Sequence, residues 1–167
     1  MVTFICTGNW YRSRFAAAYA RHRGLNAISR GIEVYRVFDE RLKHPDKISL
    51  KPVCELNHCM MAQESYDYLK QLGVSDEVIA KEPYARQLDL TTDVYRSSVV
   101  IALYEQEHYP MLWKHHQYRE IASKIMYWDI KDLPPKVLDS PEELLESKSA
   151  NVSLGEIKRL IDSMFMV

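Results

Sequence analysis

The sequence has few of the features that mark secreted, membrane-spanning or strongly charged proteins. It contains only three cysteines in 167 residues, an odd number that does not suggest the disulfide framework of a secreted domain. No apolar run is long enough to cross a bilayer, and the N-terminus lacks the basic start and longer apolar region of a signal peptide. The 22 basic and 23 acidic residues give a net charge of −1, which indicates neither nucleic acid nor a membrane as a partner. We therefore expect a cytoplasmic protein in which any attraction for an anion is local.

The length and the apolar content fit one domain with one core. Hydrophobic residues make up 47% of the chain, and 167 residues lie near the usual size of a single domain. The sequence contains no internal repeat and no low-complexity tract. We expect residues 1–167 to form one domain, as a monomer or a weak dimer.

Short apolar stretches alternate with helical stretches along the chain. Buried strands are predicted at residues 2–6, 26–34, 98–103 and 124–128. Helices are predicted at residues 13–23, 63–72, 105–116 and 154–165. Ser153 with Glu156 three residues later is a capping-box pattern, which predicts that the last helix begins there. The alternation predicts an α/β fold, a three-layer sandwich with a four-stranded parallel sheet and helices on both faces.

Two stretches are expected to be irregular. Residues 35–51 are charged, contain Pro45 and show no period, which is typical of a long surface loop. Residues 133–150 contain three prolines, although residues 142–146 could form one or two helical turns.

The motif with the clearest chemistry is Cys-Thr-Gly-Asn-Trp-Tyr-Arg-Ser at residues 6–13, between the first expected strand and the first expected helix. A helix N-terminus presents unpaired backbone N–H groups and the positive end of a dipole, so it binds phosphate and favours a thiolate. Glycine lets the backbone curl close to an anion, and asparagine tolerates a left-handed conformation. The expected phosphate-binding loop consists of Cys6, Thr7, Gly8, Asn9, Trp10, Tyr11 and Arg12.

Three side chains of this motif have expected roles in phosphoryl transfer. Cys6 would attack phosphorus as a thiolate and form a cysteinyl-phosphate that water hydrolyses. Arg12 would grip two phosphate oxygens as charge develops on them. The hydroxyl of Ser13 would donate to the thiolate, which favours the ionised form and helps the sulfur to leave in the second step. Taken alone, Cys6 is equally typical of a small apolar core residue.

These eight residues, directly after the first expected strand, resemble the phosphate loop of the low-molecular-weight protein tyrosine phosphatases. That family shares its fold with thioredoxin-coupled arsenate reductases and protein-arginine phosphatases. Tyr-Ala-Arg-Gln-Leu at residues 84–88 also resembles the family's Ala-Arg segment before the third strand. The resemblance implies a protein-tyrosine phosphatase without metal or cofactor. Its substrate would be a phosphotyrosine protein or peptide, or another aryl phosphate.

The resemblance also implies an aspartate general acid on a late loop. Residues 128–134, Trp-Asp-Ile-Lys-Asp-Leu-Pro, occupy the corresponding place. The common family pattern has two aspartates three residues apart, of which the second is catalytic, and this implies that role for Asp132. Because Leu133 replaces the proline that normally follows, Asp129 is the alternative acid. Either side chain could instead be a solvated loop carboxylate.

Three positions depart from the family pattern. Tyr11 stands where relatives often carry a second cysteine, so the protective disulfide of those relatives is absent. Trp10 occupies a position that helps relatives to choose between phosphotyrosine and phosphoarginine; it could stack on an aromatic substrate, narrow the entrance or pack on the protein's own surface. Arg14 replaces a common proline and adds positive charge near the site.

The sequence also allows functions other than that of a tyrosine phosphatase. The departures at Trp10, Arg14 and Leu133 leave room for a phosphate-binding regulatory module with weak or no catalysis. A protein-arginine phosphatase and an arsenate reductase are further alternatives. The reductase would need two more cysteines, one of them just after the third strand, where this chain has Tyr104 and Glu105.

Cys54, His58 and Cys59 form the one cluster of residue types that bind metals. A structural zinc site needs four ligands, and no second Cys/His cluster accompanies this one. We therefore interpret the two cysteines as buried thiols near a helix and expect no metal.

Overall fold

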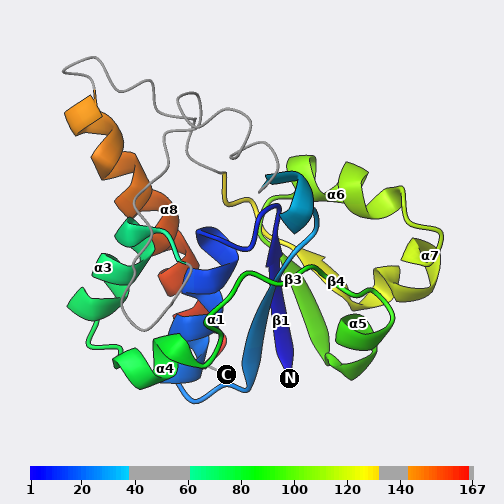
Figure 1. Cartoon of the computed structure of the whole chain (residues 1–167), viewed down its shortest axis with the longest axis horizontal. Coiled ribbons are helices and arrows are strands. Elements are labelled where there is room, and N and C mark those ends of the chain that lie inside the picture. Colours follow the sequence, from blue (N-terminus) through cyan, green and yellow to red (C-terminus); the bar gives the residue numbers. More distant parts are fainter. Residues whose placement is uncertain (38–60, 132–142, 166–167) are drawn as a thin grey trace.

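A parallel sheet lies between two layers of helices in the computed structural model, which describes residues 1–37, 61–131 and 143–165 (Figure 1). The order of the strands is β2-β1-β3-β4, and every neighbouring pair is parallel. The strands are β1 (Val2–Cys6), β2 (Ala27–Gly31), β3 (Val99–Ala102) and β4 (Ile125–Tyr127). The predicted α/β fold with a four-stranded parallel sheet is therefore confirmed.

The helices divide between the two faces of the sheet (Figure 1). One face carries α1 (Arg12–His22), α3 (Gln63–Gln71), α4 (Asp76–Ala80) and α8 (Glu143–Ser163). The other face carries α5 (Thr92–Arg96), α6 (Glu105–Trp113) and α7 (Tyr118–Ile121), and a 3-10 turn (Ala122–Lys124) precedes β4. Helix α1 is buried almost throughout because alanines fill its centre, which lets it pack between the sheet and α8.

Strand β1 is central and buried on both faces. Its side chains alternate, so that Phe4 and Cys6 join the cluster beneath α1, while Ile5 joins the cluster beneath α6. Cys6 pairs with Gly31 of β2, and Ile5 pairs with Ala102 of β3. The carboxyl ends of β1, β2 and β3 therefore meet at one edge of the sheet, which is where parallel α/β folds bind ligands.

Several element boundaries differ from the prediction, and α4, α5 and α7 were not predicted. The strand predicted at residues 26–34 ends at Gly31, and residues 34–37 are helical instead. Helix α8 begins at Glu143, ten residues before the predicted start, so Ser153 lies inside it. The hydroxyl of Ser153 donates to the carbonyl of Lys131 at 3.3 Å, and Glu156 pairs with Arg159 one turn further on. The capping-box interpretation was wrong because the same spacing also suits contacts inside a helix.

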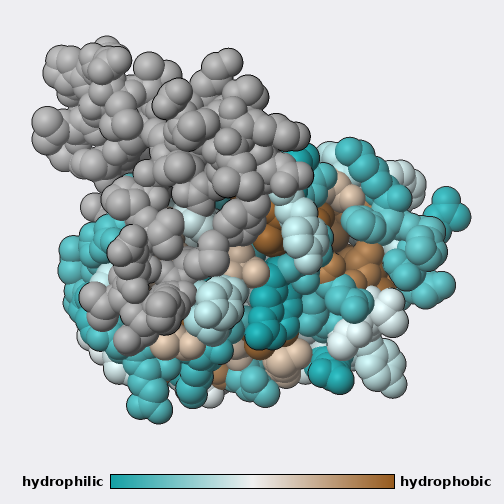
Figure 2. All heavy atoms as spheres, in the orientation of Figure 1, coloured by the Kyte–Doolittle hydropathy of each residue, from teal (hydrophilic) through white to brown (hydrophobic). Residues whose placement is uncertain are grey.

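The surface of the described residues is mostly hydrophilic on the face shown in Figure 2, with hydrophobic side chains gathered in the area enclosed by α5, α6 and α7. None of the helices in this part of the chain combines the length and apolar character that crossing a bilayer requires.

Candidate active site

The loop between β1 and α1 crosses the carboxyl edge of the sheet. It leaves β1 at Cys6 and enters α1 at Arg12. Asn9, in the middle of the loop, has a φ of 52°, and no other non-glycine residue in the described ranges has a positive φ. Asn9 therefore adopts the left-handed conformation that asparagine tolerates. It lets the chain turn back from the strand into the helix within five residues.

A directed chain of hydrogen bonds ends at the sulfur of Cys6. The backbone N–H of Arg86 donates to Asn9 Oδ1 at 2.8 Å, which fixes the orientation of the Asn9 amide. Asn9 Nδ2 then donates to Ser13 Oγ at 3.0 Å. Ser13 Oγ lies 2.9 Å from Cys6 Sγ, and since it accepts from Asn9, its own proton is available for donation to the sulfur. A hydroxyl at this distance can donate to a sulfur that carries negative charge.

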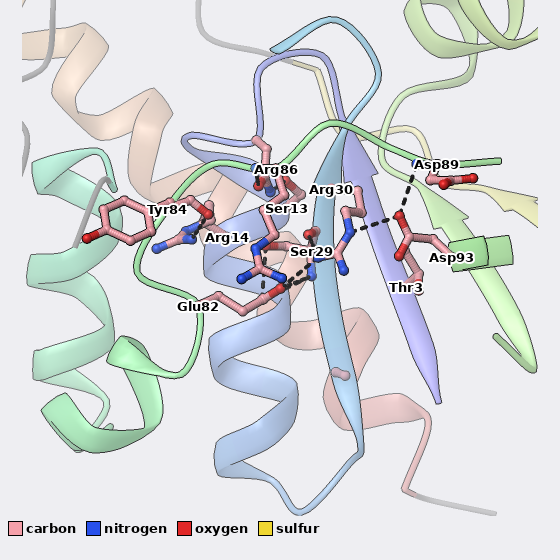
Figure 3. A network of polar contacts seen from close by, with 12 residues as sticks. Thr3, Ser13, Arg14, Ser29, Arg30, Glu82, Tyr84, Arg86, Asp89 and Asp93 are labelled. Atoms are coloured by element: carbon pink, nitrogen blue, oxygen red, sulfur yellow. Dashed lines mark hydrogen bonds and ion pairs between the residues drawn. The ribbon is translucent and has the colours of Figure 1, made fainter. Parts of the chain in front are cut away.

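The segment that supplies the Arg86 amide runs along the outer edge of β2 (Figure 3). The amide of Gly31 donates to Arg86 O at 2.8 Å, and the amide of Leu88 donates to Gly31 O at 2.7 Å. Glu82 fixes the start of the segment, because its buried carboxylate accepts from the amide and hydroxyl of Ser29, both at 3.0 Å. Arg21 also donates to this carboxylate, at 2.8 Å, and so does Arg30, at 3.1 Å (Figure 3 shows Arg30 beside Glu82). The network therefore holds the Arg86 amide in register with the loop.

Arg12 is buried at the start of α1, with 1% of its side chain exposed. Its Nη1 donates to the carbonyl of Ile130 at 2.8 Å, and its Nη2 pairs with Glu107 Oε2 at 2.9 Å. Glu107 lies in the first turn of α6, and its second oxygen accepts a hydrogen bond from the hydroxyl of Thr7. One carboxylate thus joins both ends of the loop. Burial opposes the charge of Glu107, but the guanidinium of Arg12 and the hydrogen bonds from Thr7 and Arg12 outweigh it and lower the pKa of Glu107.

His108 lies behind this carboxylate and is fully buried. The backbone N–H of Tyr104 donates to His108 Nδ1 at 3.1 Å, so Nε2 carries the proton in the neutral ring. Nε2 lies 3.7 Å from Glu107 Oε2 and has no hydrogen-bond partner among the described residues. Burial, and then the positive charge of Arg12, lower the pKa of His108 to about 4 against the opposing effect of Glu107.

Gly31 lets the loop approach the end of β2. A Cβ atom on Gly31 would lie 2.9 Å from both the Asn9 nitrogen and the Thr7 oxygen, and closer still to a methyl group of Val34. Gly8, by contrast, has no positive φ, and a Cβ there would meet the Val37 side chain at 3.2 Å. The loop therefore depends more strictly on the glycine beneath it, Gly31, than on Gly8 within it.

The structure places most of the predicted site residues around this loop. Trp10 is partly buried and packs against the core cluster beneath α1, and Tyr11 is buried in that cluster. Arg14 is also buried, and its Nη1 donates to Tyr84 O at 2.9 Å, so its charge lies against the segment along β2 (Figure 3). Asp129 is exposed and adjoins Ile130, whose carbonyl contacts Arg12.

The remaining predictions fall on parts of the chain that are not described. Asp132, the first choice for a general acid, and the cluster of Cys54, His58 and Cys59 lie outside the described residues. Within residues 1–37, 61–131 and 143–165, no three metal-binding side chains come together.

Sequence reasoning missed the partners of Arg12. Glu107 and Ile130 are distant from the loop in sequence, and neither belongs to a recognisable motif. The sequence position of Glu107 could have identified it, because it lies in the first helical turn after the third strand. In a parallel sheet, the end of that strand lies at the same edge as the loop after the first strand.

The sheet order, the two helical layers and the loop from β1 to α1 define the fold of the low-molecular-weight protein tyrosine phosphatases. The YwlE arginine phosphatase of Geobacillus stearothermophilus is similar over 98% of this chain and 88% of its own, with 20% identity and a TM-score of 0.61. SP-PTP, a low-molecular-weight protein tyrosine phosphatase of Streptococcus pyogenes, is similar over 99% and 93%, with 15% identity and a TM-score of 0.58. Vibrio vulnificus Wzb, solved with benzylphosphonate, is similar over 95% and 94%, with 15% identity and a TM-score of 0.57. No family model and no curated protein sequence matches the chain.

Proposed function

We propose that this chain is a cysteine-dependent phosphomonoester hydrolase that acts through a cysteinyl-phosphate intermediate. The observation that carries the proposal is the Ser13 hydroxyl, which lies 2.9 Å from the Cys6 sulfur and accepts a hydrogen bond from Asn9, so that its own proton is available to the sulfur. A thiol that serves only as a core residue needs no such donor. The similarity in fold to phosphatases that share 15–20% of their residues with this chain supports the same interpretation.

In the first step, Cys6 Sγ attacks phosphorus. The S–P bond forms while the bond from phosphorus to the leaving oxygen breaks, and an aspartic acid gives its proton to that oxygen. We assign the acid to Asp132, with Asp129 as the alternative. Arg12 and the loop amides stabilise the negative charge that the transferring phosphoryl group carries.

In the second step, water attacks the phosphorus of the cysteinyl-phosphate. The aspartate accepts a proton from this water, the S–P bond breaks and inorganic phosphate leaves. The sulfur departs as a thiolate, and the Ser13 hydroxyl stabilises it as it forms.

The substrate that we propose is phosphotyrosine in a protein or peptide, or another aryl phosphate. The benzylphosphonate bound to the similar Wzb protein has an aromatic ring next to a tetrahedral anion, as phosphotyrosine does. Phosphoarginine is the second candidate, because the similar YwlE protein is an arginine phosphatase.

Steady-state hydrolysis of p-nitrophenyl phosphate by the purified chain tests the proposal. We expect turnover by the wild type, none by Cys6→Ser, and a rate about 10²–10⁴-fold lower for Asp132→Ala, since that is the usual contribution of a general acid. Asp129→Ala tests the alternative acid. Asp67→Ala, which removes an exposed carboxylate from α3, is the matched control and should leave the rate unchanged.

The competing functions give different results in the same assays. A phosphate-binding module binds inorganic phosphate in calorimetry but shows no turnover with any variant. An arsenate reductase shows thiol-dependent arsenate turnover. The kcat/KM values for a phosphotyrosine peptide and for a phosphoarginine peptide then decide which substrate class the enzyme prefers.

A further inference from the structure

Glu107 contacts the two ends of the phosphate-binding loop at once. One oxygen accepts from the hydroxyl of Thr7, the residue after the nucleophile, and the other pairs with Nη2 of Arg12 at 2.9 Å. Thr7 is held from a second side, because its carbonyl accepts from the amide of Glu33 at 2.9 Å. The loop is therefore clamped where it begins and where it ends, by a side chain that comes from α6.

The position of Glu107 in the first turn of α6 does not by itself explain its contacts with Thr7 and Arg12. Acidic residues are common in the first turn of a helix, where they complement the helix dipole. Glu105 lies in the same turn, and its side chain is exposed. Glu107 differs, because only 25% of its side chain is exposed and its charge lies against a guanidinium that is buried almost completely. Removing one member of such a pair leaves the other charged, buried and poorly placed.

His108 supports Glu107 from behind. The Tyr104 amide fixes the ring so that its protonated Nε2 lies 3.7 Å from Glu107 Oε2. The ring is fully buried and fills the space next to the carboxylate, which limits the positions that Glu107 can adopt.

We propose that Glu107 is the positioning residue for Arg12 and Thr7, and that it sets the geometry in which the loop binds the phosphoryl group. The kinetic consequences of this inference rest on the proposed function. Its consequence for phosphate binding holds whether or not the chain is an enzyme. A guanidinium stabilises a phosphoryl group best when its donors are already in place, and displacement by about 1 Å can cost about 100-fold in rate.

The kinetic test compares Glu107→Ala and Glu107→Gln with the control Glu105→Gln, using p-nitrophenyl phosphate. We expect Glu107→Ala to lower kcat/KM about 100-fold, mostly through kcat, because correct placement of Arg12 matters most in the transition state. Glutamine keeps the shape of the side chain and can still accept from Arg12. Glu107→Gln should therefore stay within about tenfold of the wild type, and Glu105→Gln should equal it.

A double-mutant cycle with Arg12→Lys shows whether Glu107 acts through Arg12. Lysine cannot make the forked contacts of a guanidinium, so Glu107→Ala should cost less than about threefold in that background. A purely structural role would give the same loss in both backgrounds, with no recovery in Glu107→Gln, and would overturn the inference. Thermal unfolding of each variant checks that the fold is kept.

Calorimetric titration with inorganic phosphate separates this inference from the proposed function. We expect phosphate to bind about tenfold more weakly to Glu107→Ala than to the wild type or Glu105→Gln. If the wild type binds phosphate but hydrolyses nothing, the proposed function fails and this titration alone decides the role of Glu107. Equal binding by Glu107→Ala would show that the carboxylate does not assist phosphate binding, and tighter binding would show that it competes with phosphate; either result would overturn the inference.

Discussion

The hydroxyl of Ser13 lies 2.9 Å from the sulfur of Cys6. The two residues are seven positions apart, one at the end of a strand and the other in the first turn of a helix. Because Asn9 donates to the same hydroxyl, the Ser13 proton is available for another acceptor, and the sulfur lies within hydrogen-bond distance of it.

Ser13→Ala should make the sulfur less reactive without unfolding the protein. A hydrogen bond to a charged group contributes about 1.5–3 kcal/mol, so alkylation of Cys6 by iodoacetamide at pH 6 should slow by about 10-fold or more. Ser97→Ala is the matched control, because Ser97 is also buried and hydrogen-bonded, to Thr3 at 2.6 Å, but lies at the opposite end of the sheet. Equal alkylation rates in the two variants would show that the Ser13 hydroxyl does not act on the sulfur.

Asn9→Asp should impair activity more than Asn9→Gly. The aspartate has the same shape and can still accept from the Arg86 amide, but its second oxygen cannot donate to Ser13. The Ser13 proton would then turn towards the carboxylate and away from Cys6. Glycine loses both hydrogen bonds but adopts the φ of 52° without strain. Steady-state kcat on p-nitrophenyl phosphate checks the order, and the opposite order would refute the directed chain.

Gly31→Ala should disturb the loop although Gly31 lies outside it. The added Cβ would lie 2.9 Å from two backbone atoms of the loop, which must shift to make room. We expect kcat/KM to fall about 100-fold and the free energy of unfolding to fall by about 1–3 kcal/mol. Gly155→Ala is the control, since its Cβ would meet only the Tyr68 hydroxyl at 3.8 Å, and inside α8 it should raise stability by up to about 1 kcal/mol. Urea unfolding and kinetics on both variants measure the contrast.

The buried His108 should make the protein less stable in acid. Its pKa is about 4 in the folded protein and 6.5 in its ordinary state, so between these values the unfolded chain binds more protons. The contribution of His108 to the free energy of unfolding is therefore fully present above pH 6.5. It is lost as the pH falls from 6.5 towards 4, and the total loss is about 3 kcal/mol. The glutamine in His108→Gln does not titrate. Over the same pH range, the free energy of unfolding should therefore fall by about 3 kcal/mol less in this variant than in the wild type. Urea unfolding at pH 7 and pH 4.5 measures the difference, and parallel losses in both proteins would contradict it.

Local sequence patterns predicted the elements that build the loop. The first strand matched residue for residue, and α1 differed by one residue at each end, because an apolar run that stops at a Gly-Asn turn and an alanine-rich stretch followed by Gly24 agree there. The left-handed φ of Asn9 is consistent with the tolerance of asparagine for that conformation. The end of β2 and the start of α8 were not predicted. At these points the local pattern allowed more than one structure, and packing decided between them.

The support of the loop could not be predicted from local patterns, because it depends on long-range contacts. The ion pair between Arg12 and Glu107 joins positions 95 apart, and the hydrogen bond from Arg12 to Ile130 joins positions 118 apart. Parallel topology predicts which strand ends meet, but side-chain rotamers and burial decide which carboxylate reaches the guanidinium. The motif therefore names the candidate reactive groups, and the fold was needed to find which residues hold them.

These two distant contacts have a consequence for the protein during its synthesis. A nascent chain that has left the ribosome as far as α1 already contains Cys6, Ser13 and Arg12, but Glu107 of α6 and Ile130, which follows β4 and also holds the guanidinium, have not yet emerged. The loop therefore reaches its final geometry only after residue 130 has been translated and the sheet has closed around it.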